Sequence, residues 1–140
     1  MRKRVLYLSV AIIAVVVFAF AGCSDAGNDP DDTTTGALFS PPSWIIGTWQ
    51  DAYDTNSYTF ESDNITFESS TTTVNFKEAY KEADVSENIT DSLYEATVEI
   101  ESDGTVYTSV YKFEKTSTTA VDYSITTSGV TTGPIELIKQ

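Results

Sequence analysis

The residues able to carry chemistry in this chain are few in kind. Cys23 is the only cysteine, and histidine is absent. Nucleophile pairs and zinc sites that depend on histidine are therefore excluded. The 21 acidic residues show no spacing that marks a catalytic pair, and alternate acids such as Glu99 and Glu101 fit the solvent face of a strand. We therefore expect no enzyme, no metal site and no cofactor.

The segment before Cys23 has the three parts of a secretory signal. A basic cluster at residues 2–4 precedes an apolar run at residues 5–21, and small residues stand directly before the cysteine. This order is typical of a cleavable export signal. A retained membrane helix is the alternative, because about 17 apolar residues reach the lower limit for spanning a bilayer. The run ends without a basic flank, which favours cleavage and a signal peptide over residues 1–22.

The residues Phe20-Ala21-Gly22-Cys23 resemble the lipobox of bacterial lipoproteins, although Leu is usual where Phe20 stands. The resemblance implies that a signal peptidase cuts before Cys23 and that the thiol carries a diacylglycerol. The chain is then exported and lipid-anchored in the cell envelope, at the outer membrane or the periplasmic face of the inner membrane. An ordinary signal peptide is the alternative.

The charge of the chain restricts its partners. Loss of residues 1–22 removes three of the eight basic residues, so the formal net charge of −13 becomes −16. Such a surface repels nucleic acid and anionic lipid headgroups. We expect a monomer that reaches the membrane only through its lipid, with no nucleic-acid partner. The remaining partner classes are an envelope protein and a small apolar ligand.

Composition divides the rest of the chain into a tether and a domain. Residues 23–43 are rich in Asp, Thr, Gly and Pro and lack apolar periodicity, which predicts a flexible acidic tether. Their aspartates lack the ligand spacing of an EF-hand loop. Residues 44–140 form the expected folded domain.

Residues 44–140 alternate apolar and polar side chains in short runs. Runs begin near residues 45, 58, 65, 72, 94, 107, 121 and 135, and the clearest covers 94–101. Such alternation is typical of half-buried strands, and Asp103-Gly104 is a strong hairpin signal. One short helix is expected near residues 76–84. The sequence predicts an all-β domain, a small antiparallel up-and-down barrel of about eight strands, with a β-sandwich as the alternative.

Gly47 and Trp49 open the first expected strand, directly after Ile45-Ile46. This Gly-x-Trp placement resembles the lipocalin (calycin) superfamily. The resemblance implies a barrel that binds a small apolar ligand, with a basic residue of the last strand packed on the Trp. The domain has no arginine, so Lys139 is the candidate for that position.

Nine aromatic residues have the parity expected of the barrel interior: Tyr58, Phe60, Phe67, Phe76, Tyr94, Tyr107, Tyr111, Phe113 and Tyr123. So many rings would occupy much of an eight-stranded barrel, which favours a filled interior over an open cavity. We therefore expect a membrane-anchored lipoprotein with a non-enzymatic β-barrel domain that has an interaction or structural role in the envelope. Lipocalin-like binding of a small apolar ligand is the alternative.

Overall fold

A computed structural model describes residues 38–140. The expected signal segment, Cys23 and most of the expected tether lie outside the described residues. The described part begins with residues that the sequence placed in the tether, yet Phe39 and Pro41 are buried. The ring centroid of Phe39 lies 5.7 Å from that of Phe76. The packed region therefore begins ahead of Trp44.

The described residues form nine strands and one short helix. The strands are β1 (Gly47–Asp51), β2 (Asn56–Phe60), β3 (Ile65–Ser69), β4 (Thr73–Asn75), β5 (Asp84–Ile89), β6 (Leu93–Ser102), β7 (Thr105–Lys115), β8 (Ala120–Thr127) and β9 (Val130–Lys139), and the helix is α1 (Phe76–Ala79). All neighbouring strands are antiparallel, in the order β4-β3-β2-β1-β9-β8-β7-β6-β5. The expected all-β, antiparallel, barrel-like fold is thus confirmed.

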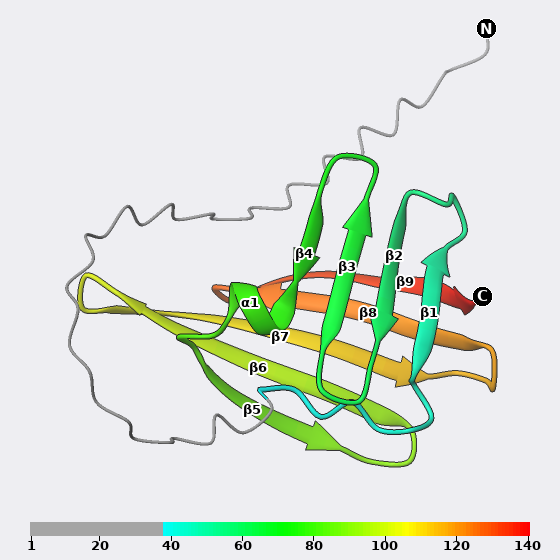
Figure 1. The fold of residues 1–140 in the computed structure, drawn as a ribbon, viewed down its shortest axis with the longest axis horizontal. Coiled ribbons are helices and arrows are strands. Elements are labelled where there is room, and N and C mark those ends of the chain that lie inside the picture. Colours follow the sequence, from blue (N-terminus) through cyan, green and yellow to red (C-terminus); the bar gives the residue numbers. More distant parts are fainter. Residues whose placement is uncertain (1–37) are drawn as a thin grey trace, which may run out of the picture. The chain divides into compact units, whose positions relative to one another are not determined.

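The sheet curls so that its short strands cross its long ones. In Figure 1, β1–β4 run across the front of β6–β9. Rings from the two sets meet between them, and the centroids of Tyr58 in β2 and Phe113 in β7 are 5.4 Å apart. Backbone strand pairing joins the two sets through β1 and β9, from the Trp49–Lys139 pair to the Asp51–Leu137 pair. The core therefore lies inside the curl.

The curl is not closed by strand pairing, because β4 and β5 are the two edges of the sheet. The segment before β1 bridges this opening through its side chains and one amide. Phe39 packs on α1, the amide of Ser40 donates to Glu87 Oε1 at 2.8 Å, and Trp44 Nε1 donates to the carbonyl of Thr90 at 3.0 Å. The structure is therefore an open barrel in which the segment before β1 covers the gap between β4 and β5.

Strand β5 is the element that the alternation pattern missed. Its register places Val85, Glu87 and Ile89 opposite the inward residues of β6, so an acid occupies the middle inward position. That acid is held by polar contacts, because Tyr94 donates its hydroxyl to Glu87 Oε1 at 2.6 Å. An apolar–polar count cannot recognise a strand whose inward side chain is a hydrogen-bonded carboxylate.

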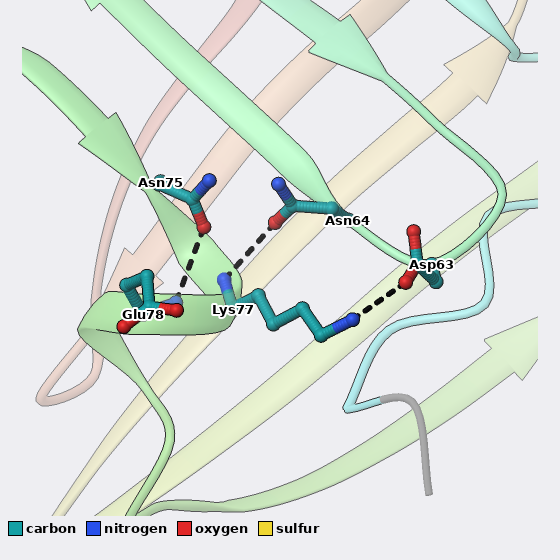
Figure 2. Close-up of polar contacts among 5 residues, drawn as sticks. All are labelled: Asp63, Asn64, Asn75, Lys77 and Glu78. Carbon is teal, nitrogen blue, oxygen red and sulfur yellow. Dashed lines mark hydrogen bonds and ion pairs between the residues drawn. The ribbon is translucent and has the colours of Figure 1, made fainter.

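Helix α1 is shorter than the predicted 76–84 and is fixed by side chains of the β2–β3 turn and of β4 (Figure 2). Asn75 Oδ1 accepts the amide hydrogen of Glu78 at 3.1 Å, and Asn64 Oδ1 accepts that of Lys77 at 3.0 Å. These two amides lack partners within a helix. The ammonium of Lys77 also lies 2.5 Å from Asp63 Oδ2. The helix then ends at Ala79, because the chain must turn into β5.

Candidate functional site

The interior of the curl is filled with aromatic rings. Eight of the nine residues predicted to point inward are buried: Tyr58, Phe60, Phe67, Phe76, Tyr94, Tyr111, Phe113 and Tyr123. Centroids of neighbouring rings are close, at 4.9 Å for Phe60 and Phe113 and 4.8 Å for Tyr58 and Tyr123. Edge-on and tilted contacts of this kind pack a core densely.

The prediction for Tyr107 was wrong. Its side chain has the inward parity, since it pairs with Ile100 two positions beyond Val98, but it is 52% exposed. The reason is the extent of the cover: β1–β4 lie across the long strands, and β6 and β7, with 10 and 11 residues, extend past them and past α1 (Figure 1). The last part of the β6–β7 hairpin therefore has no strand over it.

Tyrosine hydroxyls supply the polar groups of the interior. Those of Tyr80 and Tyr111 form a short hydrogen bond. Burial, with a smaller effect from Tyr80, raises the pKa of Tyr111, and burial raises the pKa of Tyr123 to about 12. For Tyr58, burial and then the neighbouring Tyr123 raise the pKa well above its usual value. These phenols stay neutral at ordinary pH and serve as hydrogen-bonding members of a core.

The predicted fold motif comes together where β1 pairs with β9, at the corner between the two sets of strands. Trp49 and Lys139 are a cross-strand pair, and the Lys139 ammonium lies 5.2 Å from the centroid of the buried Trp49 ring. A Cβ on residue 47 would lie only 3.3 Å from Cε of Lys139. The backbone φ of +121° at Gly47 also favours glycine over residues with a side chain. Trp49 Nε1 donates to the carbonyl of Ile45 at 2.6 Å. At this corner the side chain of Lys139 packs on the indole ring of Trp49.

Asp51 is a buried acid that the sequence analysis did not single out. Its carboxylate accepts hydrogen bonds from the amides of Tyr53 and Thr55, the Thr55 hydroxyl and the Asn56 side chain, at 2.7–3.1 Å. Burial alone would raise the pKa of Asp51, but together these hydrogen bonds outweigh burial and lower it. The sequence feature that could have identified Asp51 is the run of turn residues after β1, because an Asp in such a turn can accept hydrogen bonds from the amides two and four positions ahead. Its role is to hold the β1–β2 turn.

A polar depression of about 200 Å³ lies beside this turn. It is lined by polar side chains of the β1–β2 turn, β2 and the end of β3, including Asp54, Asn56 and Glu68. Over residues 38–140, no group of three His, Cys, Asp or Glu side chains could hold a metal ion. The depression therefore offers hydrogen-bonding groups to solvent and no enclosed apolar volume.

The inner face of β6–β9 has two ends that differ in exposure. The covered end, under β1–β4, holds buried side chains: Tyr94, Ala96, Val98, Tyr111, Phe113, Val121, Tyr123 and Leu137. The uncovered end has the same parity and consists of Ile100, Tyr107 and Val130, which are 39%, 52% and 70% exposed. Ile135 is also 40% exposed, but it pairs with the buried Tyr123 of the covered end. In Figure 1 the β6–β7 hairpin extends past α1.

The side chains between these apolar groups are uncharged. Ile125 and Thr132 are a cross-strand pair, as are Ser109 and Thr127, and the hydroxyls of Ser109 and Thr127 lie 3.3 Å apart. The uncovered end is thus an apolar strip with interspersed hydroxyls on a concave face. It is the most unusual exposed surface of the described domain, because large apolar groups that share one face mark contact sites more often than scattered ones do.

No family model, no curated protein and no solved structure matches the chain. Cys23, the residue predicted to carry a lipid, lies outside the described residues. Among those that are described, no helix is both long and apolar enough to cross a membrane.

Proposed function

We propose that the chain is a membrane-anchored lipoprotein whose β domain has a non-enzymatic role in the cell envelope and acts by surface contact with another envelope component. The observation that carries this proposal is the filled interior, where rings such as Phe60, Phe113 and Tyr123 pack against one another. A barrel filled by its own side chains leaves its surface as the place for recognition. The uncovered end supports the proposal, because it presents apolar side chains to the outside.

The anchoring part of the proposal rests on Cys23 and the signal-like segment before it. The test is labelling of cells that express the full chain with a fatty acid carrying an alkyne. The parent chain should take up label, and Cys23→Ala should lose it and keep the mass of the precursor. Ser24→Ala is the matched control, since it leaves the thiol in place and should label like the parent. Equal labelling of the Cys23→Ala chain would contradict lipid attachment at this residue.

Lipocalin-like binding of a small apolar ligand is the second candidate function. The corner of Gly47, Trp49 and Lys139 favours it, because a basic residue of the last strand packs on the Trp of the first, as the resemblance implies. The packed rings oppose it, because drug-sized ligands need a pocket of about 300–1,000 Å³.

The two candidates make opposite predictions for an apolar ligand. The test is titration of the full chain with an environment-sensitive apolar dye in a Trp44→Phe background, so that within residues 38–140 only Trp49 emits. Our proposal predicts no saturable dye signal from the interior and unchanged Trp49 emission. A saturable signal that quenches or shifts Trp49 would favour the ligand-binding alternative and would count against the interaction role.

A further inference from the structure

We propose that residues 38–44 form a strap that opens while the sheet remains folded, and that its opening uncovers an aromatic entrance to the core between β4 and β5. The proposal goes beyond the function proposed above and does not depend on it. In Figure 1 the strap is the cyan segment that runs beside β5 before the chain reaches β1.

The first argument is the way in which the strap is attached. The ring of Phe39 is fully buried, the amide of Ser40 donates to Glu87 Oε1, and Trp44 Nε1 donates to the carbonyl of Thr90. Both hydrogen bonds lie at exposed positions. Within residues 38–140, no backbone-to-backbone hydrogen bond joins the strap to a strand. Segments held by few buried contacts and by exposed hydrogen bonds open at a lower free energy than paired strands do.

The second argument is the sharp boundary of the strap, which ends at Trp44 because the next residue belongs to the core. Ile45 is fully buried, and its carbonyl accepts the indole N–H of Trp49 at 2.6 Å. The amide of Ile45 donates to the carbonyl of Pro42 at 3.0 Å, which is a local bond and does not tie the strap to the sheet. Opening therefore stops at Ile45 and leaves Trp49 in place.

The third argument is what the strap covers. The ring centroid of Phe39 lies 5.7 Å from that of Phe76 and 6.3 Å from that of Tyr80, and Phe76 is buried. Withdrawal of Phe39 leaves these two rings facing solvent. The carboxylate of Glu87 then loses the Ser40 amide and keeps the hydrogen bond from the Tyr94 hydroxyl. The open state thus presents core rings, beside a carboxylate, at the surface of a barrel whose interior is otherwise filled.

The test follows the two tryptophans of the full chain separately. Both are replaced biosynthetically by 5-fluorotryptophan, and Trp44→Phe assigns the two fluorine NMR resonances. The chain is held in nanodiscs of zwitterionic phosphatidylcholine and unfolded with urea. Trp44 reports on the strap and Trp49 on the core. We expect the Trp44 resonance to reach its unfolded position at a lower urea concentration than the Trp49 resonance, since non-coincident transitions mark separate unfolding steps.

A matched pair of truncations separates the strap from the core. Phe39→Ala removes contacts that exist only in the closed state, so it should raise the ratio of open to closed strap by about 100-fold or more. It should lower the Trp44 midpoint and leave the Trp49 midpoint unchanged. Phe67→Ala is the control, because it makes the same truncation at a buried ring of β3. It should lower the Trp49 midpoint.

Ser40→Pro is a second variant, which keeps the ring of Phe39 and removes the amide hydrogen that Glu87 accepts. It should also lower the Trp44 midpoint and leave the Trp49 midpoint unchanged, with a smaller effect. If Phe39→Ala does not fold, this variant decides the question. The proposal is overturned if the two resonances of the parent change at the same urea concentration, or if the strap variants lower both midpoints equally. None of these outcomes depends on acylation at Cys23, so failure of the strap and failure of the anchor are distinguishable.

Discussion

The covered and uncovered ends of the inner face belong to the same strands and differ only in what lies over them. Along β7, Phe113 and Tyr107 have the same parity, yet Phe113 is fully buried and Tyr107 is half exposed. The alternation of a strand determines which face a side chain occupies. Whether that face is buried depends on how far the strands that cross it extend along it. The difference shows that an inward-facing aromatic can be a core residue at one end of a hairpin and half exposed to solvent at the other.

The largest expected effect separates the two ends by truncation. Phe113→Ala removes a ring that packs on Tyr58, Phe60 and Tyr123 and should lower the free energy of unfolding by about 3–5 kcal/mol. Tyr107→Ala, six positions away on the same face, should lower it by less than about 1 kcal/mol, because its ring is already in solvent. Urea unfolding followed by circular dichroism measures both. Similar losses would mean that the uncovered end is part of the core.

Much of the fold could be predicted from period and turn chemistry, since both are local. Asp103 and Gly104 have positive φ in the turn between β6 and β7, as the hairpin signal indicated, and the alternation of 94–101 lies within β6. Strand β5 was missed because Glu87 occupies an inward position and is held by Tyr94. The exposure of Tyr107 was missed because it depends on non-local cover.

The candidate sites were predictable to different degrees for the same reason. Gly47, Trp49 and Lys139 were chosen from the resemblance of the Gly-x-Trp motif and its basic partner in the last strand, and the pairing of β1 with β9 brings Trp49 and Lys139 together. The Asp51 turn carried a local signal that was overlooked. The uncovered end could not be found from sequence, because its members Ile100 and Val130 are distant in the chain and look like ordinary core residues.

A second prediction uses alkaline pH to probe the covered end. The folded-state pKa of Tyr123 is raised to about 12 from an ordinary value of 10.0, so the unfolded chain loses this proton first as pH rises. The stability that this group contributes is complete below pH 10 and is lost toward pH 12. The loss amounts to about 3 kcal/mol.

The measurement compares unfolding free energies at pH 9 and pH 12 in the parent and in Tyr123→Phe. The parent should lose more than the variant by about 2 kcal/mol over this interval, since Phe has no proton to release and the folded parent is itself half ionised at pH 12. Tyr107→Phe removes a hydroxyl from the uncovered end and is the matched control at pH 9, where it should change the free energy of unfolding by less than about 0.5 kcal/mol because this side chain is half exposed. An unchanged profile in Tyr123→Phe would place that hydroxyl in contact with solvent.

A third prediction concerns the β1–β2 turn, which the carboxylate of Asp51 holds. Asp51→Asn replaces a carboxylate that accepts four hydrogen bonds, and it should cost about 2 kcal/mol because donors are left unmatched. The folded-state pKa of Asp51 is lowered, so its stabilising effect is complete above the ordinary Asp range and is lost as pH falls through the folded value. The parent should therefore lose more stability in acid than the variant. Asp54→Asn, on the same turn, is the control: it removes a carboxylate that accepts none of these four hydrogen bonds and should change the free energy of unfolding by less than about 0.5 kcal/mol.

The smallest expected effect tests how β1–β4, which cover the inner face, are joined to the long strands β6–β9. Lys139 of β9 lies over Trp49 of β1, next to the few residue pairs that link the two sets of strands. Lys139→Met keeps an unbranched stem and removes the charge, so it isolates the attraction between ammonium and indole, worth about 0.5–1 kcal/mol. Lys139→Ala also removes the stem, which should cost more because long charged side chains bury their methylene groups. If salt lowers the parent's stability relative to Lys139→Met, the charge contributes. If both variants match the parent at every salt concentration, the attachment of β1–β4 to the long strands depends on neither the charge nor the stem of Lys139, and the backbone pairs of β1 and β9 together with the rings packed between the two sets hold it.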